Sequence, residues 1–325
     1  MAVVWGCMST ARRKTVKLVV GTRGSALSLA QTDSVIKKLI RLRPGVSVTR
    51  KIIRTRGDKD LLTPLWMFKR KGVFEREIDL EVSRGEVHFA VHSMKDLPTS
   101  LPPPLSIVAV PSRESPNDVL VTRRGLKISE LPLGACVGTS SLRRKAQLLR
   151  VRRDLKIIPI RGNVETRALN IERGLLDAVI LAEAGLLRLG LGHLVSERLP
   201  LDSFAPAPGQ GALAVVARRG DRGLRMLLRA VNHLPSMAEV LSERSLTRRL
   251  GAGCKAALGA VARSEGDMLT LYGSVLSPDG EKEVHASLQG PMARPAELGR
   301  RVAEEIERRG GMELVSRWRL ASTGG

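Results

Sequence analysis

The sequence predicts an α/β protein in which two similar lobes are joined by a double hinge and followed by a small α+β domain. Residues 18–27 and 135–142 both run from an apolar strand through Gly-Thr and serine into a helix-forming stretch, which indicates a duplicated unit. Proline-rich stretches at 97–104 and 199–211 follow the two copies and are typical of linkers. Beyond residue 231 the pattern no longer repeats, so a separate domain is expected there.

The strands of both lobes are short apolar runs separated by helical stretches. In chain order, we expect strands at 17–20, 48–53, 89–91, 136–137, 157–160 and 178–181. Alternating strands and helices predict a mainly parallel sheet in each lobe. Polar residues that follow these strands would then meet at the carboxyl edge of the sheet, where ligands bind in such folds.

The C-terminal part shows a different order of elements. A helix is expected at 237–250, then a glycine-flanked cysteine loop and a hairpin at 268–288 that turns at Ser277-Pro-Asp-Gly280. The last helix has an apolar face formed by Leu298, Val302 and Ile306. The predicted boundaries are 1–16 for an N-terminal tail, 17–104 with 206–230 for domain 1, 105–205 for domain 2 and 231–325 for domain 3.

Composition narrows the function. The chain has 325 residues with 54 Lys and Arg against 32 Asp and Glu, a formal charge of +22, so it requires an anionic partner or substrate. Nucleic acid is the default candidate, but aromatic residues make up only 2% of the chain and offer no stacking platform for bases. Residues 122–173 hold 13 basic residues against 4 acids, which locates the anion site in domain 2.

The same composition predicts a soluble protein of the reducing cytoplasm. Three cysteines form no CxxC pair, so neither a disulfide framework nor a cysteine zinc site is specified. The histidines are scattered, and we expect no metal site. No stretch has the length and apolarity of a membrane span, and no secretory signal is recognisable.

Hydroxyl and guanidinium groups follow the strand expected at 136–137. They belong to Thr139, Ser141, Arg143 and Arg144. At a helix N-terminus this set suits a carboxylate or phosphate, and Arg161 and Arg167, which follow the next strand, would lie at the same edge. The alternative is a serine-capped helix with a solvated basic face.

Ser93, Lys95 and Asp96 follow the strand expected at 89–91. An acid among so many cations should stay ionised, and such a carboxylate can stabilise a developing positive charge. The alternative is that Asp96 caps a turn or pairs with Lys95, and His92 is expected to be a structural hydrogen-bonding residue. Cys254 is flanked by glycines and Lys255, which would expose its sulfur and favour the thiolate; the alternative is an idle loop thiol.

These motifs together resemble the porphobilinogen deaminase (hydroxymethylbilane synthase) family over nearly the whole chain from residue 18. They are Thr22-Arg-Gly-Ser25, Lys71-Gly-Val-Phe74, Ala90-Val-His-Ser-Met-Lys-Asp-Leu-Pro98, Val137-Gly-Thr-Ser-Ser-Leu-Arg-Arg144, Arg161-Gly-Asn-Val-Glu-Thr-Arg167, Pro208-Gly-Gln-Gly-Ala212 and the Cys254 loop. The resemblance implies two lobes like those of periplasmic binding proteins and a small third domain. It also implies that the enzyme deaminates porphobilinogen and condenses four units head to tail into hydroxymethylbilane, the linear tetrapyrrole of haem and porphyrin biosynthesis.

The resemblance further implies a dipyrromethane cofactor, attached through a thioether at Cys254, and Asp96 as the catalytic carboxylate. Cofactor contacts are implied for Ser93, Lys95, Thr139, Ser141, Arg143, Arg144, Arg161 and Arg188. Substrate contacts are implied for Arg23, Ser25, Lys71, Phe74 and Arg167. Each pyrrole carries an acetate and a propionate, which would account for the basic lobe without nucleic acid. The family also implies a monomer.

Two other functions remain open at this point. A two-lobed anion receptor could use the same site without chemistry, but it would have no use for a third domain with an exposed cysteine, and it normally carries an export signal. A nucleic-acid binder would exploit the +22 charge, although binding that vanishes at moderate salt would show only nonspecific phosphate attraction.

Overall fold

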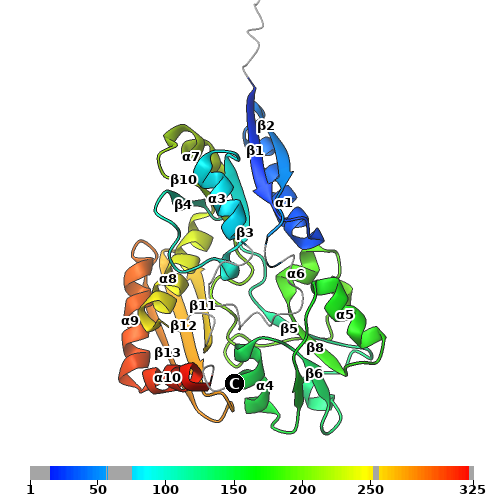
Figure 1. Cartoon of the computed structure of the whole chain (residues 1–325). Helices are drawn as coiled ribbons and strands as arrows, with labels where there is room; N and C mark the ends of the chain where they lie inside the picture. Colours follow the sequence, from blue (N-terminus) through cyan, green and yellow to red (C-terminus); the bar gives the residue numbers. More distant parts are fainter. Residues whose placement is uncertain (1–14, 56, 58–74, 252–255, 322–325) are drawn as a thin grey trace, which may run out of the picture.

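The computed structural model describes residues 15–55, 57, 75–251 and 256–321. Figure 1 shows two α/β lobes, one above the other, with the C-terminal domain beside the lower lobe. Among the described residues, no helix is long and apolar enough to cross a membrane.

Lobe 1 is built on a five-stranded sheet with the order β2-β1-β3-β10-β4. Its strands are β1 (Val16–Thr22), β2 (Val46–Ile52), β3 (Phe89–Ser93), β4 (Leu105–Ala109) and β10 (Leu213–Arg218). β1 lies parallel to β2 and β3, whereas β10 is antiparallel to β3 and β4. Helices α1 (Ala26–Leu42) and α7 (Arg222–Leu228) cover one face, and α3 (Arg76–Arg84) covers the other.

Lobe 2 repeats this arrangement with the order β7-β6-β8-β5-β9. Its strands are β5 (Asp118–Thr122), β6 (Cys136–Gly138), β7 (Lys156–Ile158), β8 (Ala178–Ala182) and β9 (Glu197–Arg198). β6 lies parallel to β7 and β8, and β5 is antiparallel to β8 and β9. Its helices are α4 (Leu142–Val151), α5 (Val164–Glu172) and α6 (Glu183–Arg188). The matching orders confirm the predicted duplication, and all six predicted strands form.

The chain crosses between the lobes twice, as the double hinge predicts, but the first crossing lies further along the chain. The proline-rich stretch 97–104 leads into β4, which pairs with β10 in the sheet of lobe 1. The predicted domain boundary after residue 104 therefore moves to the segment 110–117, between β4 and β5. The boundary was misplaced because prolines are common both in linkers and in the residues that directly precede an edge strand such as β4. The second crossing, between β9 and β10, contains the whole predicted stretch 199–211.

The two crossing segments contact each other closely. The Glu114 N–H donates to the Gly211 carbonyl at 3.2 Å. Gly211 has φ +85°, and a Cβ at this position would lie 2.2 Å from the Glu114 carbonyl oxygen. Only glycine permits both this conformation and this approach.

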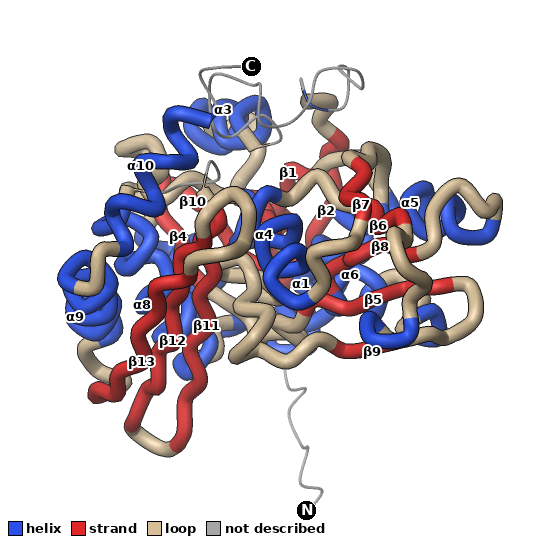
Figure 2. The backbone as a smooth tube through the Cα atoms, turned by 90° about the horizontal axis from the view of Figure 1, so that it is seen from below, coloured by secondary structure: helices blue, strands red, loops and turns tan. Residues whose placement is uncertain are grey.

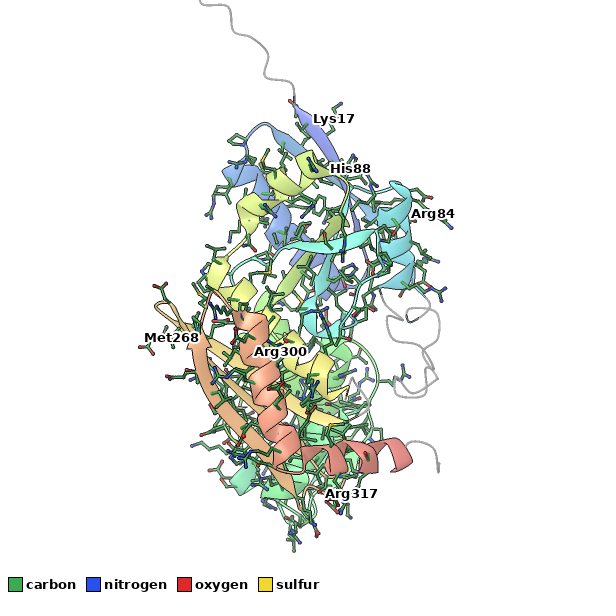
Figure 3. All side chains as sticks on the ribbon, turned by 90° about the vertical axis from the view of Figure 1, so that its left-hand side faces the viewer. Lys17, Arg84, His88, Met268, Arg300 and Arg317 are labelled. Carbon is green, nitrogen blue, oxygen red and sulfur yellow. The ribbon has the colours of Figure 1, made fainter. Side chains whose placement is uncertain are left out.

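The C-terminal domain is a three-stranded antiparallel sheet of β11 (Ala257–Glu265), β12 (Met268–Leu276) and β13 (Glu283–Pro291). It is packed with α8 (Leu234–Leu250), α9 (Pro295–Arg308) and α10 (Gly311–Ala321). The predicted hairpin and helices are confirmed, and the predicted apolar face of α9 is buried. Figure 3 shows α9 in front of the sheet and α10 below α9, and Arg300 on α9 and Arg317 on α10 are exposed.

Glu243 of α8 joins this domain to the crossing segments. Its carboxylate is fully buried and accepts hydrogen bonds from Arg113 Nη1 at 2.6 Å, from the Gly209 N–H at 2.5 Å and from the Ala262 N–H at 2.8 Å. Arg113 also donates to the Gln210 carbonyl at 2.9 Å. Because one charge satisfies donors from three elements, it fixes the C-terminal domain against both crossings.

Candidate active site

The first half of the site lies where β3 ends in lobe 1. A short 3₁₀ turn (Met94–Asp96) follows the strand, and the buried Met94 anchors it, with its N–H bonded to the Ala212 carbonyl at 3.0 Å. Ser93 Oγ accepts a hydrogen bond from Gln31 Nε2 at 2.9 Å. Lys95 Nζ donates to Gln210 Oε1 at 3.3 Å. The side chain of Asp96 is exposed, so its carboxylate is accessible to a ligand.

The charge of Lys95 is perturbed by its surroundings. Burial lowers the pKa of Lys95 to about 8. The nearby charges of Arg143 and Arg144 act in the same direction, and the carboxylates of Asp96 and Asp118 oppose it. The lysine of lobe 1 therefore lies within electrostatic reach of the arginines of lobe 2.

The second half of the site begins where β6 ends. Ser141 caps α4, its Oγ accepting from the Arg144 N–H at 3.4 Å. Thr139 is buried, and its Oγ1 accepts from the Ser141 N–H at 3.2 Å. Ser140 Oγ accepts from the Ile160 N–H at 3.0 Å, which ties this loop to the segment after β7. The hydroxyls of Thr139 and Ser141 thus shape the loop locally.

Arg143 and Arg144 do not form a solvated basic face. Their side chains are only 6% and 8% exposed, and both bind the fully buried carboxylate of Asp118, at 2.7 Å and 2.6 Å. Burial by itself would raise the pKa of Asp118, but the two guanidiniums hold it far below its usual range. The basic helix of the sequence is therefore half of a buried ion cluster, and the alternative of a solvated face is wrong.

Gln210 connects this cluster to Lys95 across the second crossing. Its Nε2 donates to Asp118 Oδ1 at 2.9 Å and to the Pro116 carbonyl at 2.8 Å, while its Oε1 accepts from Lys95. A continuous polar chain thus runs from the turn after β3, through Gln210, to Asp118 in lobe 2.

Three further arginines of lobe 2 were predicted as site residues. Arg167 on α5 donates to the Gly162 carbonyl at 3.0 Å. The pKa of Arg167 is lowered to about 10, mainly by burial and in part by the charges of Arg144 and Arg161, whereas the charge of Asp96 opposes this shift. Arg161 Nη2 is buried without a hydrogen-bond partner. Arg188 on α6 instead donates to the Gly211 carbonyl at 2.6 Å, so it binds the second crossing.

The remaining predicted site residues are divided between described and undescribed segments. Arg23 follows β1, and Ser25 caps α1, with its Oγ also bonded to Ser28 Oγ at 2.9 Å. Lys71, Phe74 and Cys254 lie outside the described residues.

No group of three or more His, Cys, Asp or Glu within the described part of the chain could hold a metal ion. His92 pairs with Asp79 at 3.1 Å in a buried position, a structural role as predicted.

Asp118 and Gln31 were missed as site residues by sequence reasoning. Asp118 is the first residue of the apolar run that forms β5, and this is the one signal that could have found it. An acid at the first position of a buried strand needs a cationic partner, because burying an unpaired charge is costly. Gln31 carries no such signal, because a single glutamine on a helix is common.

Comparison with known proteins places this geometry in a family. The sequence model of "Porphobilinogen deaminase, dipyromethane cofactor binding domain" matches residues 18–226, and that of "Porphobilinogen deaminase, C-terminal domain" matches residues 237–308. The porphobilinogen deaminase of Desulforudis audaxviator is 47% identical over 94% of this chain and 99% of its own. That of Thermus thermophilus is 43% identical over 93% of this chain and 99% of its own. Among solved structures, the VFT2 domain of Bordetella pertussis BvgS aligns at 16% identity with a TM-score of 0.41, over 68% of this chain and 91% of that one.

Proposed function

Because the chain belongs to the porphobilinogen deaminase family, we propose that Asp96 is its catalytic carboxylate and that a dipyrromethane is attached through a thioether at Cys254. The chain is a transferase of tetrapyrrole biosynthesis that deaminates porphobilinogen and condenses four units into hydroxymethylbilane. Its first matched domain is a dipyrromethane cofactor binding domain.

The charge balance of lobe 2 fits such a cofactor, which brings several carboxylates. Asp118 neutralises at most one of the two guanidiniums that bind it. Burial lowers the pKa of Arg167, and the charges of its neighbours Arg144 and Arg161 act in the same direction; Arg161 Nη2 is buried without a hydrogen-bond partner. Bound carboxylates would relieve this repulsion and satisfy the buried N–H group. We therefore propose that Arg161 and Arg167 hold the acidic side chains of the bound pyrroles.

Arg143 and Arg144 would contribute in a different way. Arg144 uses Nε and Nη2 on Asp118 and Nη1 on the Ile180 carbonyl. Arg143 places Nη1 against Asp118, Gln147 and Ala205. Contacts of these two residues with a cofactor carboxylate would be added to an ion cluster that already exists, so the cluster would orient the guanidiniums before the ligand binds. Ser93, Thr139, Ser141, Lys95 and Arg188 remain proposed cofactor contacts, and Arg23, Ser25, Lys71 and Phe74 remain proposed substrate contacts.

The surroundings of Asp96 support its proposed role as the catalytic carboxylate. It lies at the carboxyl end of β3, is exposed, and is close enough to Lys95 and Arg167 to raise the pKa of each. When bound, the dipyrromethane supplies the pyrrole carbon to which the first substrate unit is joined. As ammonia leaves porphobilinogen, positive charge develops on the substrate pyrrole, and the Asp96 carboxylate would stabilise it. Lys95, as a proposed cofactor contact, and Arg167, as a proposed substrate contact, would give this end of the site a positive charge that attracts the anionic substrate.

The proposal is tested by Asp96→Asn, which keeps the shape of the side chain and removes its charge. Two unit charges about 4 Å apart at an effective dielectric near 20 interact by about 4 kcal/mol. If this interaction acts mainly in the transition state, its loss slows turnover by roughly three orders of magnitude. Single-turnover ammonia release from the holoprotein should show this with an unchanged Tm, and Asp96→Glu should keep more activity than Asp96→Asn.

The matched control is Asp33→Asn, which removes an exposed carboxylate of the same lobe that pairs with Arg50 at 2.9 Å. We expect normal turnover, because exposed ion pairs contribute little. If Asp96→Asn lowers the Tm without slowing ammonia release, Asp96 caps or pairs locally and has no place in the mechanism. Intact mass of the purified chain tests the thioether, because a dipyrrole must add its mass to wild type and not to Cys254→Ser.

A further inference from the structure

The turn between β12 and β13 of the C-terminal domain presses against the backbone of α4 in lobe 2. Gly280 in this turn has φ +74°, and a Cβ there would lie 2.3 Å from the Ala146 carbonyl oxygen and 2.9 Å from the Arg150 nitrogen. Both atoms belong to the α4 backbone, so no side-chain rotation could relieve the overlap. The turn and the helix are therefore in direct backbone contact.

α4 contacts both the C-terminal domain and the second crossing. Ala146 is fully buried in the same apolar cluster as Leu246 of α8 and Leu271 of β12, both in the C-terminal domain. Arg143 and Gln147, which lie next to Ala146 on the same face of the helix, bind the Ala205 carbonyl in the second crossing, at 2.8 Å and 2.9 Å. A displacement of α4 by the turn would therefore move the Arg143 guanidinium as well.

The turn is braced and cannot yield easily. The Ser277 N–H donates to the Lys282 carbonyl at 2.9 Å, and the Lys282 N–H donates to Ser277 Oγ at 3.0 Å. The Glu281 N–H donates to Asp279 Oδ1 at 3.0 Å. Beside the turn, Arg150 of α4 pairs at 3.0 Å with Glu283, whose side chain is only 10% exposed. The turn that contacts α4 is therefore held in shape by its own hydrogen bonds, and the Arg150–Glu283 ion pair lies beside the contact.

We propose that Gly280 is a positioning residue, which sets α4 and its arginines at a fixed place relative to the C-terminal domain. This inference rests on the proposed function, in which the C-terminal domain carries the cofactor at Cys254 and α4 helps to bind its carboxylates. The segment containing Cys254 lies between α8 and β11 of that domain. Cys254 in the C-terminal domain and the arginines of α4 in lobe 2 would bind the same cofactor, so the distance between the two domains must be fixed. The contact between the turn and α4 would fix it.

The test compares Gly280→Ala with Gly266→Ala. Gly266 lies in the other turn of the same sheet, between β11 and β12, with φ +55° and no atom within 4 Å of an added Cβ. Both substitutions force alanine into the left-handed region, but only Gly280→Ala collides with α4. To reach ordinary contact, the turn and helix would have to separate by about 1 Å, and such a misplacement can cost about 10²-fold in rate.

Three readouts separate positioning from plain loss of stability: the fraction of chains that carry the dipyrrole by intact mass, kcat/KM, and Tm. We expect Gly280→Ala to lose about 10²-fold in kcat/KM and to have a lower loaded fraction, with Gly266→Ala within about twofold of wild type. Equal kinetics and equal loading in the two variants would overturn the proposal, even if both melt earlier.

A second pair of variants covers the case in which Gly280→Ala does not fold. Glu283→Gln breaks the rim pair with Arg150, and its control Glu313→Gln breaks the exposed pair with Arg317 within α10. Lower loading or kcat/KM in Glu283→Gln alone supports the link, and no difference between the two overturns it. If the wild-type chain lacks the mass of the dipyrrole, the proposed thioether at Cys254 is wrong. The positioning role of Gly280 is then tested by kcat/KM alone.

Discussion

Replacing Asp118 by asparagine removes the negative charge at the centre of the buried ion cluster. The carboxylate of Asp118 is fully buried and accepts from Arg143, Arg144 and Gln210 at 2.7, 2.6 and 2.9 Å. Asparagine has nearly the same shape, so it leaves both guanidiniums buried without a counterion. Removing one partner of a buried ion pair typically costs 3–5 kcal/mol.

The expected change in melting temperature follows from this cost. With an unfolding entropy of roughly 2.1 cal/mol/K per residue and 325 residues, a loss of about 4 kcal/mol lowers the Tm by roughly 6 °C when the chain melts in one transition. Differential scanning calorimetry of the holoprotein measures it. The matched control is again Asp33→Asn, whose exposed ion pair should change the Tm by far less.

The pH dependence gives a second check on the same residue. The arginines lower the pKa of Asp118 below its unfolded value, near 3.8. Its stabilisation is therefore fully present above that unfolded pKa and is lost progressively as the pH falls toward the folded pKa. The difference in Tm between wild type and Asp118→Asn should narrow below pH 4. A Tm within 1 °C of wild type at pH 7 would refute the view that the cluster stabilises lobe 2.

Three other changes have expected outcomes. Cys254→Ser should fold but lack the bound dipyrromethane, since an alkoxide forms far less readily than a thiolate; a serine variant with full turnover would contradict the attachment. The pKa of Lys95 is about 8, so its charge is lost as the pH rises through that value, and KM for the anionic substrate should rise above pH 8. In Lys95→Arg this rise should move to higher pH, because guanidinium stays charged, and an unmoved rise would assign it to another group. Glu243→Gln should lower the Tm by several °C, since it leaves Arg113 buried beside an uncharged amide, and calorimetry showing no change would exclude Glu243 as a main link to the C-terminal domain.

Much of the fold was predictable from local patterns. The strands β1, β3 and β8 are short apolar runs bounded by polar or glycine residues, and their length and β-branched residues identify them as strands. The apolar face of α9 follows from the spacing of Leu298, Val302 and Ile306, which are all buried. The family, and with it the reaction, was also predictable, because its motifs are contiguous in sequence.

The first hinge was misplaced because pairing between distant strands is not written into a local pattern. β4 is held in lobe 1 by β10, which lies more than a hundred residues later in the chain. The prolines before β4 are consistent with either a linker or an entrance to an edge strand. The pairing of β4 with β10 shows that these prolines precede an edge strand.

The sequence by itself determined the main strands and helices, the duplicated lobes and the family. The tertiary structure alone decided which of the basic residues are buried and what they bind. A basic helix start such as Leu142-Arg143-Arg144 can face water or protein with equal local propensity, and burial selects the second here because Asp118 comes from another strand to neutralise it. The cost of burying a charge depends on which partners reach it, and partners 25 residues or more away along the chain are brought together only by the packed fold.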